Sequence, residues 1–146
     1  MLPKSVIETV ELMNMDYSLG ELSYDIVSEK YSFHKNIETK DLKLYPAEFY
    51  GLIDRKEREV PSEVIKEFIV DRLIPYNRME LDKYLKYYDL EFWDEWELFL
   101  KAKGMCFLDT FWIRRDKSEN YKETHIRFTN SVREDLLTEE HFVTGN

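Results

Sequence analysis

The sequence has 146 residues, of which 43% are hydrophobic and 15% are aromatic, and its formal net charge is −9 at pH 7. A chain of this length and hydrophobicity can bury a core within one domain, and its composition excludes an intrinsically disordered protein. The acidic balance disfavours direct binding to the phosphate backbone of nucleic acid, while it is compatible with a basic protein partner or with imitation of nucleic acid.

The single cysteine and the apolar pattern bear on the cellular compartment. Cys106 cannot form an intramolecular disulfide bond, which is typical of a reducing environment. Glu8 and Glu11 interrupt the apolar residues near the N-terminus, so we expect no secretory signal peptide. No apolar run reaches the roughly 18 residues of a membrane span. We therefore predict a cytoplasmic protein without membrane association.

Residues 6–27 predict an N-terminal β-hairpin with its turn at residues 18–20. The apolar residues that alternate with polar neighbours in its second half are Leu22, Tyr24 and Ile26. This period of two is typical of a half-buried strand. Parts of residues 5–15 also fit helical spacing, so a helix stays open there. Residues 28–60 predict an irregular, polar connection.

Three short helices are predicted between residues 61 and 104. Pro61 suits the start of the first helix, where its missing N–H costs nothing, and Pro75 prevents the helix from continuing. The apolar stripe of this helix consists of Val64, Ile65, Phe68 and Ile69. Such spacing is typical of a helix that buries one face.

Capping residues delimit the second and third helices. Asn77 and Glu80 have the spacing of a capping box for the second helix. The apolar stripe that follows consists of Leu81, Tyr84, Leu85 and Tyr88. Asp89 can cap the third helix, and Gly104 can end it in a left-handed conformation.

Residues 105–146 predict a short β-hairpin and a terminal helix. The expected strands are residues 110–115 and 124–130, joined by a turn at residues 117–120. Ser131 and Glu134 repeat the capping-box spacing before a helix over residues 133–142.

Together these elements predict one α+β domain over residues 1–146. Its parts are a hairpin and loop (1–60), a three-helix subdomain (61–104), and a C-terminal hairpin with a terminal helix (105–146). The sequence shows no internal repeat and no low-complexity segment.

The sequence lacks the spacings that announce an enzyme or a metal site. Its four glycines are isolated, so no glycine-rich loop can bind phosphate. His34, His125 and His141 lie far apart, without the Cys and His spacing of a zinc site. Cys106 has apolar neighbours and is expected to be a small buried side chain. We predict no enzymatic activity, no cofactor and no metal, although residues that only the fold brings together could still form a site.

The segment Asp89–Glu97 (DLEFWDEWE) combines five carboxylates with two tryptophans and no basic residue. On a helix, Phe92 and Trp96 would face the core, with Trp93 at the margin. The carboxylates expected on the opposite face are Glu91, Asp94, Glu95 and Glu97. One interpretation is an acidic partner-binding surface with Trp93 as its aromatic anchor, suited to a basic groove. The other is that acids near a helix start only stabilise the helix dipole.

Arg72 and Arg78 flank Pro75 at a break between two predicted helices. A guanidinium pair at this place could bind a phosphate or a carboxylate of a partner. The alternative is that both side chains bind carbonyl groups at a helix end and form salt bridges within the domain.

Three short motifs follow one another between residues 60 and 130. They consist of Arg72, Pro75 and Arg78; of Gly104, Asp109, Phe111, Trp112, Ile113 and Arg114; and of Phe128 and Asn130. In this order they resemble the region N-terminal to the catalytic core in HipA-like (CtkA-like) serine/threonine kinases of Gram-positive bacteria. Cys106 departs from the family, which usually has Ser there, and Lys122 stands where Trp is common.

The resemblance does not extend to the kinase core, because no residues here match its ATP-binding loop, its catalytic Asp or its metal-binding Asp. It therefore implies a scaffold or regulatory piece without phosphotransfer activity. Our leading hypothesis is a non-enzymatic interaction module that binds and modulates a protein such as a HipA-like kinase.

Two other hypotheses stay open. The chain could be an acidic inhibitor, encoded by a phage or mobile element, that occludes the nucleic-acid groove of a host enzyme such as a CRISPR effector. More weakly, it could bind DNA as an antitoxin-like partner. The basic residues available for DNA are Arg114, Arg115, Lys117, Arg127 and Arg133.

Overall fold

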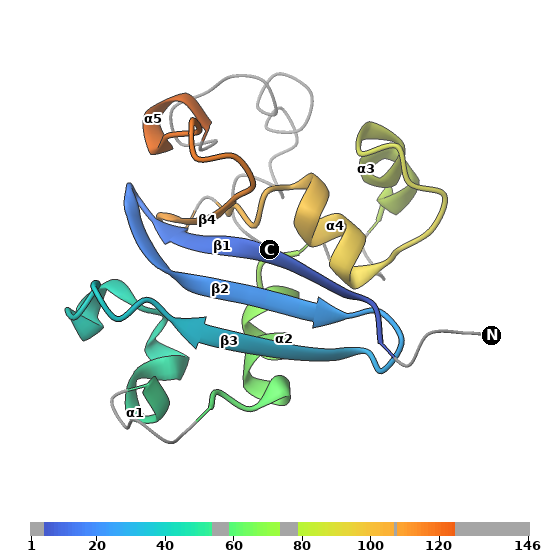
Figure 1. Cartoon of the computed structure of the whole chain (residues 1–146). Coiled ribbons are helices and arrows are strands. Elements are labelled where there is room, and N and C mark those ends of the chain that lie inside the picture. Colours follow the sequence, from blue (N-terminus) through green and yellow to red (C-terminus); the bar gives the residue numbers. More distant parts are fainter. Residues whose placement is uncertain (1–4, 54–58, 74–78, 107, 125–146) are drawn as a thin grey trace.

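The computed structural model describes residues 5–53, 59–73, 79–106 and 108–124. This part of the chain is a four-stranded antiparallel sheet combined with short helices, which confirms the mixed α and β class (Figure 1). The strands are β1 (Ile7–Asn14), β2 (Tyr17–Asp25), β3 (Lys30–Lys35) and β4 (Phe111–Arg114), in the order β3-β2-β1-β4. The helices are η1 (Leu42–Leu44), η2 (Ala47–Phe49), α1 (Tyr50–Ile53), α2 (Ser62–Val70), α3 (Leu81–Tyr87), α4 (Glu95–Lys101) and α5 (Tyr121–Thr124).

β1 and β2 form an antiparallel pair, but the turn predicted at residues 18–20 is wrong. The chain turns at Met15 and Asp16, where Met15 has a φ of 51°. Gly20 lies inside β2, beside the register shift between Leu12 and Met13, with a φ of 144°. This glycine therefore marks an irregularity within a strand, which sequence reasoning took for a turn.

The prediction of an irregular connection over residues 28–60 is wrong where β3 forms. Tyr31 and Phe33 are buried, while Ser32 and His34 between and after them are exposed. The Tyr31 amide donates to Ser62 Oγ at the start of α2 over 2.9 Å, so this contact covers part of the outer edge of β3. Blocking an edge strand in this way prevents unwanted strand pairing.

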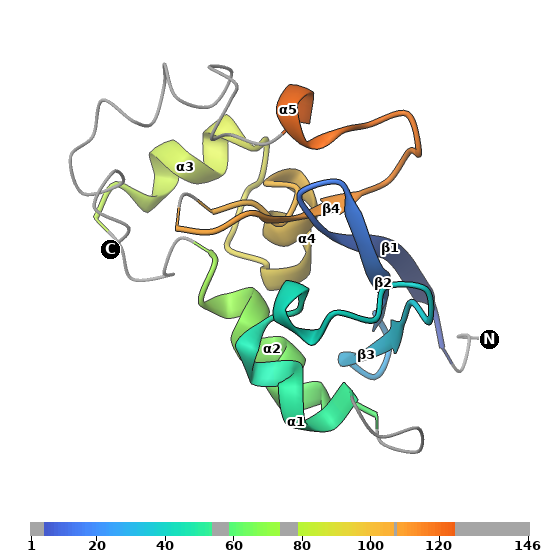
Figure 2. The same cartoon turned by 90° about the vertical axis from the view of Figure 1, so that its left-hand side faces the viewer.

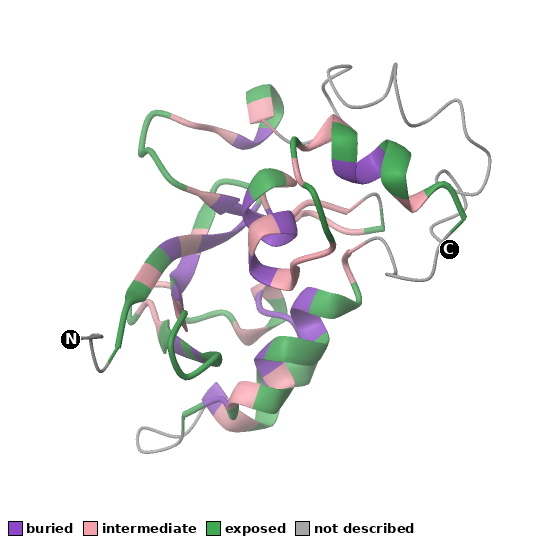
Figure 3. Cartoon of the chain, turned by 90° about the vertical axis from the view of Figure 1, so that its right-hand side faces the viewer, coloured by how far each residue is buried: buried purple, intermediate pink, exposed green. Residues whose placement is uncertain are grey.

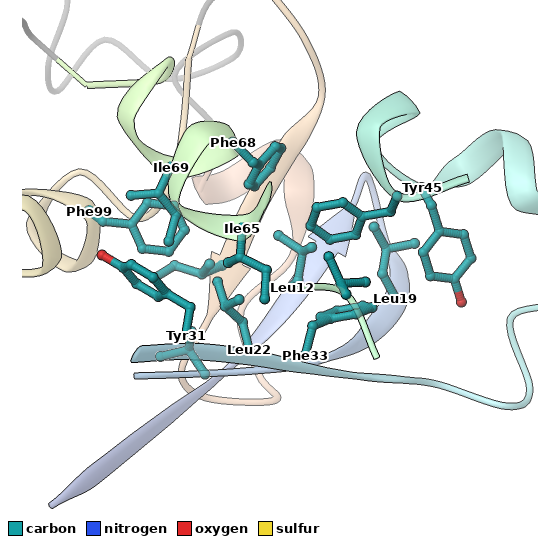
Figure 4. Close-up of a cluster of buried hydrophobic side chains, with 14 of the residues drawn as sticks. Leu12, Leu19, Leu22, Tyr31, Phe33, Tyr45, Ile65, Phe68, Ile69 and Phe99 are labelled. Atoms are coloured by element: carbon teal, nitrogen blue, oxygen red, sulfur yellow. The ribbon is translucent and has the colours of Figure 1, made fainter. Parts of the chain in front are cut away.

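One hydrophobic core joins the sheet to α2 and α4, and Figure 2 places α1, α2 and α4 on the same side of the strands. The buried residues of α2 recur at helical spacing and share one face, while the residues between them are exposed (Figure 3). Side chains from the sheet, such as Leu22 and Phe33, point towards Ile65 of α2 (Figure 4). α2, α3 and α4 lie in the region predicted to be helical, but α2 and α4 pack into the core of the sheet, so a separate three-helix subdomain is not confirmed.

The boundaries of the third helix differ from the prediction. Asp89 does not cap it; this residue has a φ of 60° just after α3, where the Leu90 amide donates to the Leu85 carbonyl over 2.8 Å. That bond is typical of a helix C-terminus. α4 begins only at Glu95, and Asp94 is its N-cap, accepting a hydrogen bond from the Glu97 amide over 3.1 Å. 

The C-terminal end of α4 follows the prediction. Gly104 has a φ of 64°, and its amide donates to the Phe99 carbonyl over 2.9 Å. A Cβ atom at this position would lie 3.1 Å from the Phe99 ring and 3.1 Å from Ile113. Close packing as well as conformation therefore favours glycine. At the start of α3, the expected partner of Glu80 in a capping box, Asn77, lies outside the described residues.

β4 forms where a strand was predicted, but its partner in the described structure is β1. Trp112 of β4 is fully buried beside Met13 and Tyr121, in a small second core under α5. The predicted returning strand (124–130) and terminal helix (133–142) lie outside the described residues, except for Thr124, which ends α5. None of the described helices has the length and apolar character that a membrane span requires.

Candidate functional site

Arg72, a predicted partner-binding residue, connects the end of α2 to the segment that leads into β4. Two of its terminal nitrogens each lie 2.6 Å from a carboxylate oxygen of Asp109, and its Nε donates to the Gly104 carbonyl over 2.7 Å. The guanidinium group also lies 4.8 Å from the centre of the Phe68 ring. Only 5% of the Arg72 side chain is exposed. This geometry matches the alternative in which the arginine bonds within the domain. Arg78 lies outside the described residues.

The other predicted binding residues lie between α3 and the first turn of α4. We call residues 89–94 the acid–aromatic loop. Phe92 in this loop has 67% of its surface exposed, whereas Trp93 is half-buried. Because residues 88–94 are not helical, the prediction that Phe92 faces the core is wrong. The exposed aromatic side chain of the loop is Phe92, and Glu91 beside it is also exposed.

Two acids of this region take part in the fold itself. Asp94 caps α4, as described above. Glu95 accepts a hydrogen bond of 2.5 Å from the Tyr31 hydroxyl and forms a salt bridge of 2.9 Å with Lys66. Burial, together with this bond to Glu95, raises the pKa of Tyr31 well above its ordinary value. The half-buried Glu97 lies one turn further into α4 and donates its amide to the cap. Some acids of this segment therefore stabilise the fold by capping α4 and by joining it to β3 and α2.

A second surface, which sequence reasoning missed as a unit, lies on the face of the sheet opposite α2. Four side chains form one row across all four strands, in the order Arg114, Glu11, Glu21 and His34. Beside this row, the Thr9 and Ser23 hydroxyl oxygens lie 2.8 Å apart. The exposed face of the sheet is therefore polar, with charges on both edge strands.

This face contains an open hollow of about 740 Å³. Its floor comes from β1 and β2, and its two rims come from the ends of the edge strands β3 and β4. The charged lining residues are Glu11, Glu21, Lys35, Arg114, Arg115 and Lys117, and His34 also contributes. The Lys35 ammonium lies over the ring of the buried Tyr45, on the α2 side of the sheet, so three permanent cations and two carboxylates remain on the open face of a protein whose net charge is −9.

Glu11 is the most constrained charge in the hollow. Burial favours the protonated form, but hydrogen bonds from Arg114 and Ser18 and the charges of Arg114 and Lys117 outweigh it, so the pKa of Glu11 lies below its ordinary value. Arg114 Nε donates to this carboxylate over 2.8 Å. The pair holds β4 to β1 and neutralises Arg114, one of the cations of the hollow.

The hollow had only a partial signal in the sequence. Arg114, Arg115 and Lys117 are close together in the chain, but nothing local indicates that they share a face of the sheet with His34, about 80 residues away. Recognising the alternation in β3 would have placed His34 on the exposed face. Among the described residues, no three His, Cys, Asp or Glu side chains are arranged to hold a metal ion.

Comparisons with protein-family models, with curated proteins and with solved structures found no match to this chain. The resemblance to the N-terminal region of HipA-like kinases therefore stays a prediction that depends on the motif residues alone. In the structure, Arg72 of the first motif binds Gly104 and Asp109 of the second. This contact gives both motifs a structural reason to occur together.

Proposed function

We propose that the protein is a non-enzymatic interaction module that binds a partner protein through the acid–aromatic loop. The observation that carries this proposal is the exposure of Phe92, 67%, on a loop that is held at both ends. At one end the Leu90 amide binds back to α3, and at the other end Asp94 caps α4. An exposed aromatic ring on an ordered segment loses little conformational entropy on binding, which is typical of an interface hot spot.

The charge around Phe92 indicates the kind of partner. Glu91 is exposed next to it, and the whole molecule is acidic. Complementary charge speeds the encounter with a basic surface and excludes acidic competitors. A regulatory role towards a kinase of the HipA-like type accords with the motif order, and it is part of the same proposal.

The alternative of a nucleic-acid mimic receives less support from this surface. A mimic must present several free carboxylates at phosphate-like positions. Asp94 and Glu95 are engaged in the cap and in the contacts with Tyr31 and Lys66. Glu91→Lys is thus a better probe of the acidic surface than a change at Asp94 or Glu95, since it leaves these contacts in place.

The test is affinity capture from host lysate with the wild-type protein, Phe92→Ala and the control variant Met79→Ala, followed by mass spectrometry. Met79 is 84% exposed and lies outside the loop. We expect one partner to be retained by the wild type and by Met79→Ala, and to fall at least tenfold with Phe92→Ala. A partner that is captured equally by all three proteins would overturn the assignment of the loop.

A further inference from the structure

We propose that the hollow on the open face of the sheet binds a short acidic segment of a partner protein, with Arg115 and Lys117 as its principal anion-binding groups. This inference is separate from the acid–aromatic loop, because it concerns the face of the sheet opposite α2 and α4. It depends on three observations: the position of the cations, their partners, and the charge of the molecule as a whole.

The permanent cations that face the hollow gather at its β4 rim. At the end of β3, His34 faces the hollow opposite Glu21, whereas Lys35 points to the other face of the sheet and lies over the Tyr45 ring. Arg115 directly follows β4, and Lys117 comes two residues later, on the other rim of the same hollow. The positive charge that an anionic group meets in the hollow therefore comes mainly from the β4 rim.

The partners of these cations differ. Arg114 is neutralised by Glu11, and Lys35 lies over the Tyr45 ring, 5.5 Å from its centre. The side chains of Arg115 and Lys117 form no hydrogen bond and no salt bridge within the described part of the chain. These two exposed groups are available to an incoming carboxylate, and an arginine can bind it through two parallel hydrogen bonds.

The charge of the whole molecule decides between a peptide and a nucleic acid. The Debye length is about 8 Å at physiological ionic strength, so a short segment experiences mainly the local positive field of the hollow. A long polyanion would extend over the rest of a surface whose net charge is −9. Glu21 on the floor would in addition repel a continuous phosphate backbone. A short peptide with a few carboxylates is repelled less, both by the acidic surface around the hollow and by Glu21.

The floor of the hollow has room for a peptide backbone. Thr9 and Ser18 contribute only small polar side chains to this floor. Hydroxyl groups can exchange hydrogen bonds with peptide amides and carbonyls. Glu21 repels acidic side chains of the segment that lie close to it. It therefore limits the number of acidic side chains that can bind at once.

The experiment measures fluorescence anisotropy with a labelled short peptide of alternating Glu and Ser, a matched Gln and Ser peptide, and a short single-stranded DNA. The proteins are the wild type, the double variant Arg115→Glu with Lys117→Glu, and the control Lys30→Glu. Lys30 is exposed at the opposite end of β3 and does not line the hollow. Circular dichroism and thermal unfolding confirm that all three are folded.

We expect the acidic peptide to bind in about 20 mM salt and to weaken at least tenfold near 300 mM, because exposed charges are screened. The double variant should bind it at least tenfold more weakly, whereas Lys30→Glu should change binding less than twofold. The Gln and Ser peptide should not bind. Absence of binding to the acidic peptide, or equal losses in both variants, would overturn the proposal. Tighter binding of DNA that requires Arg115 and Lys117 would replace the peptide with nucleic acid as the occupant.

Discussion

The backbone at Gly20 leaves no room for a side chain. A Cβ atom there would lie 2.1 Å from the His34 carbonyl oxygen, and the φ of 144° is unfavourable for any other residue. We predict that Gly20→Ala lowers the free energy of unfolding by about 2–4 kcal/mol, measured by urea titration. Gly51→Ala is the matched control: its Cβ meets no atom within 4 Å in α1, so a gain of about 0.5–1 kcal/mol is expected. Equal effects of the two changes would contradict this account.

Arg72 is expected to stabilise the folded protein. Because its side chain is buried among four acceptor atoms and two aromatic rings, Lys cannot replace its planar group. We predict that Arg72→Lys costs about 2–4 kcal/mol in the free energy of unfolding. The control Lys66→Met removes a salt bridge whose lysine is 60% exposed, and should cost less than about 1 kcal/mol. Unchanged stability of Arg72→Lys would return Arg72 to the candidates for partner binding.

The pair of Glu11 and Arg114 predicts a dependence of stability on pH. The pKa of Glu11 is below its ordinary value of 4.5 in the folded protein, so the folded state favours the carboxylate. Its contribution is fully present above the ordinary value and is lost as the pH falls below 4.5. We predict that Glu11→Gln is less stable than the wild type by about 0.5–1 kcal/mol at pH 7, and that this gap shrinks by pH 3. Thermal unfolding of both proteins at several pH values measures this difference in stability. A difference that does not change with pH would show that the ion pair is not its cause.

At the level of elements, the sequence predicted what depends on local pattern. The apolar stripe of α2, the glycine end of α4 and the strand at β4 each carry a strong local signal. The turn after β1 has no such signal. Its left-handed residue is Met15, whereas sequence patterns favour glycine in that conformation and therefore pointed to Gly20. The hollow was beyond local pattern altogether, since strand pairing between distant segments brings its rims together.

The two aspartates near α4 test the helix boundary. Asp94 caps the helix, whereas Asp89 lies in a left-handed conformation at the end of α3. We predict that Asp94→Ala lowers the free energy of unfolding by about 1 kcal/mol, because the Glu97 amide loses its acceptor. Asp89→Gly should be neutral or stabilising, since glycine adopts a positive φ without strain. The reverse order of the two effects would indicate that the helix begins at Asp89.

At the scale of the whole molecule, the shared core has a consequence for the central helices. Ile65 and Phe68 of α2 are buried against residues of the sheet. We predict that a peptide of residues 61–104 shows little helix by circular dichroism, because its helices are short and their apolar faces lack the sheet. Folding of this fragment by itself would restore the interpretation of an independent helical subdomain.

The order of the strands also has a consequence during synthesis. β1, β2 and β3 are neighbours in the sequence and can pair within microseconds once made. Glu11 and Arg114, which join β1 to β4, are 103 residues apart, so the ribosome needs roughly 5–20 s to supply the fourth strand. Throughout this interval the edge of β1 that later pairs with β4 stays open to other nascent chains. Slow translation between the third and fourth strands would therefore lengthen the period in which the protein is most exposed to aggregation.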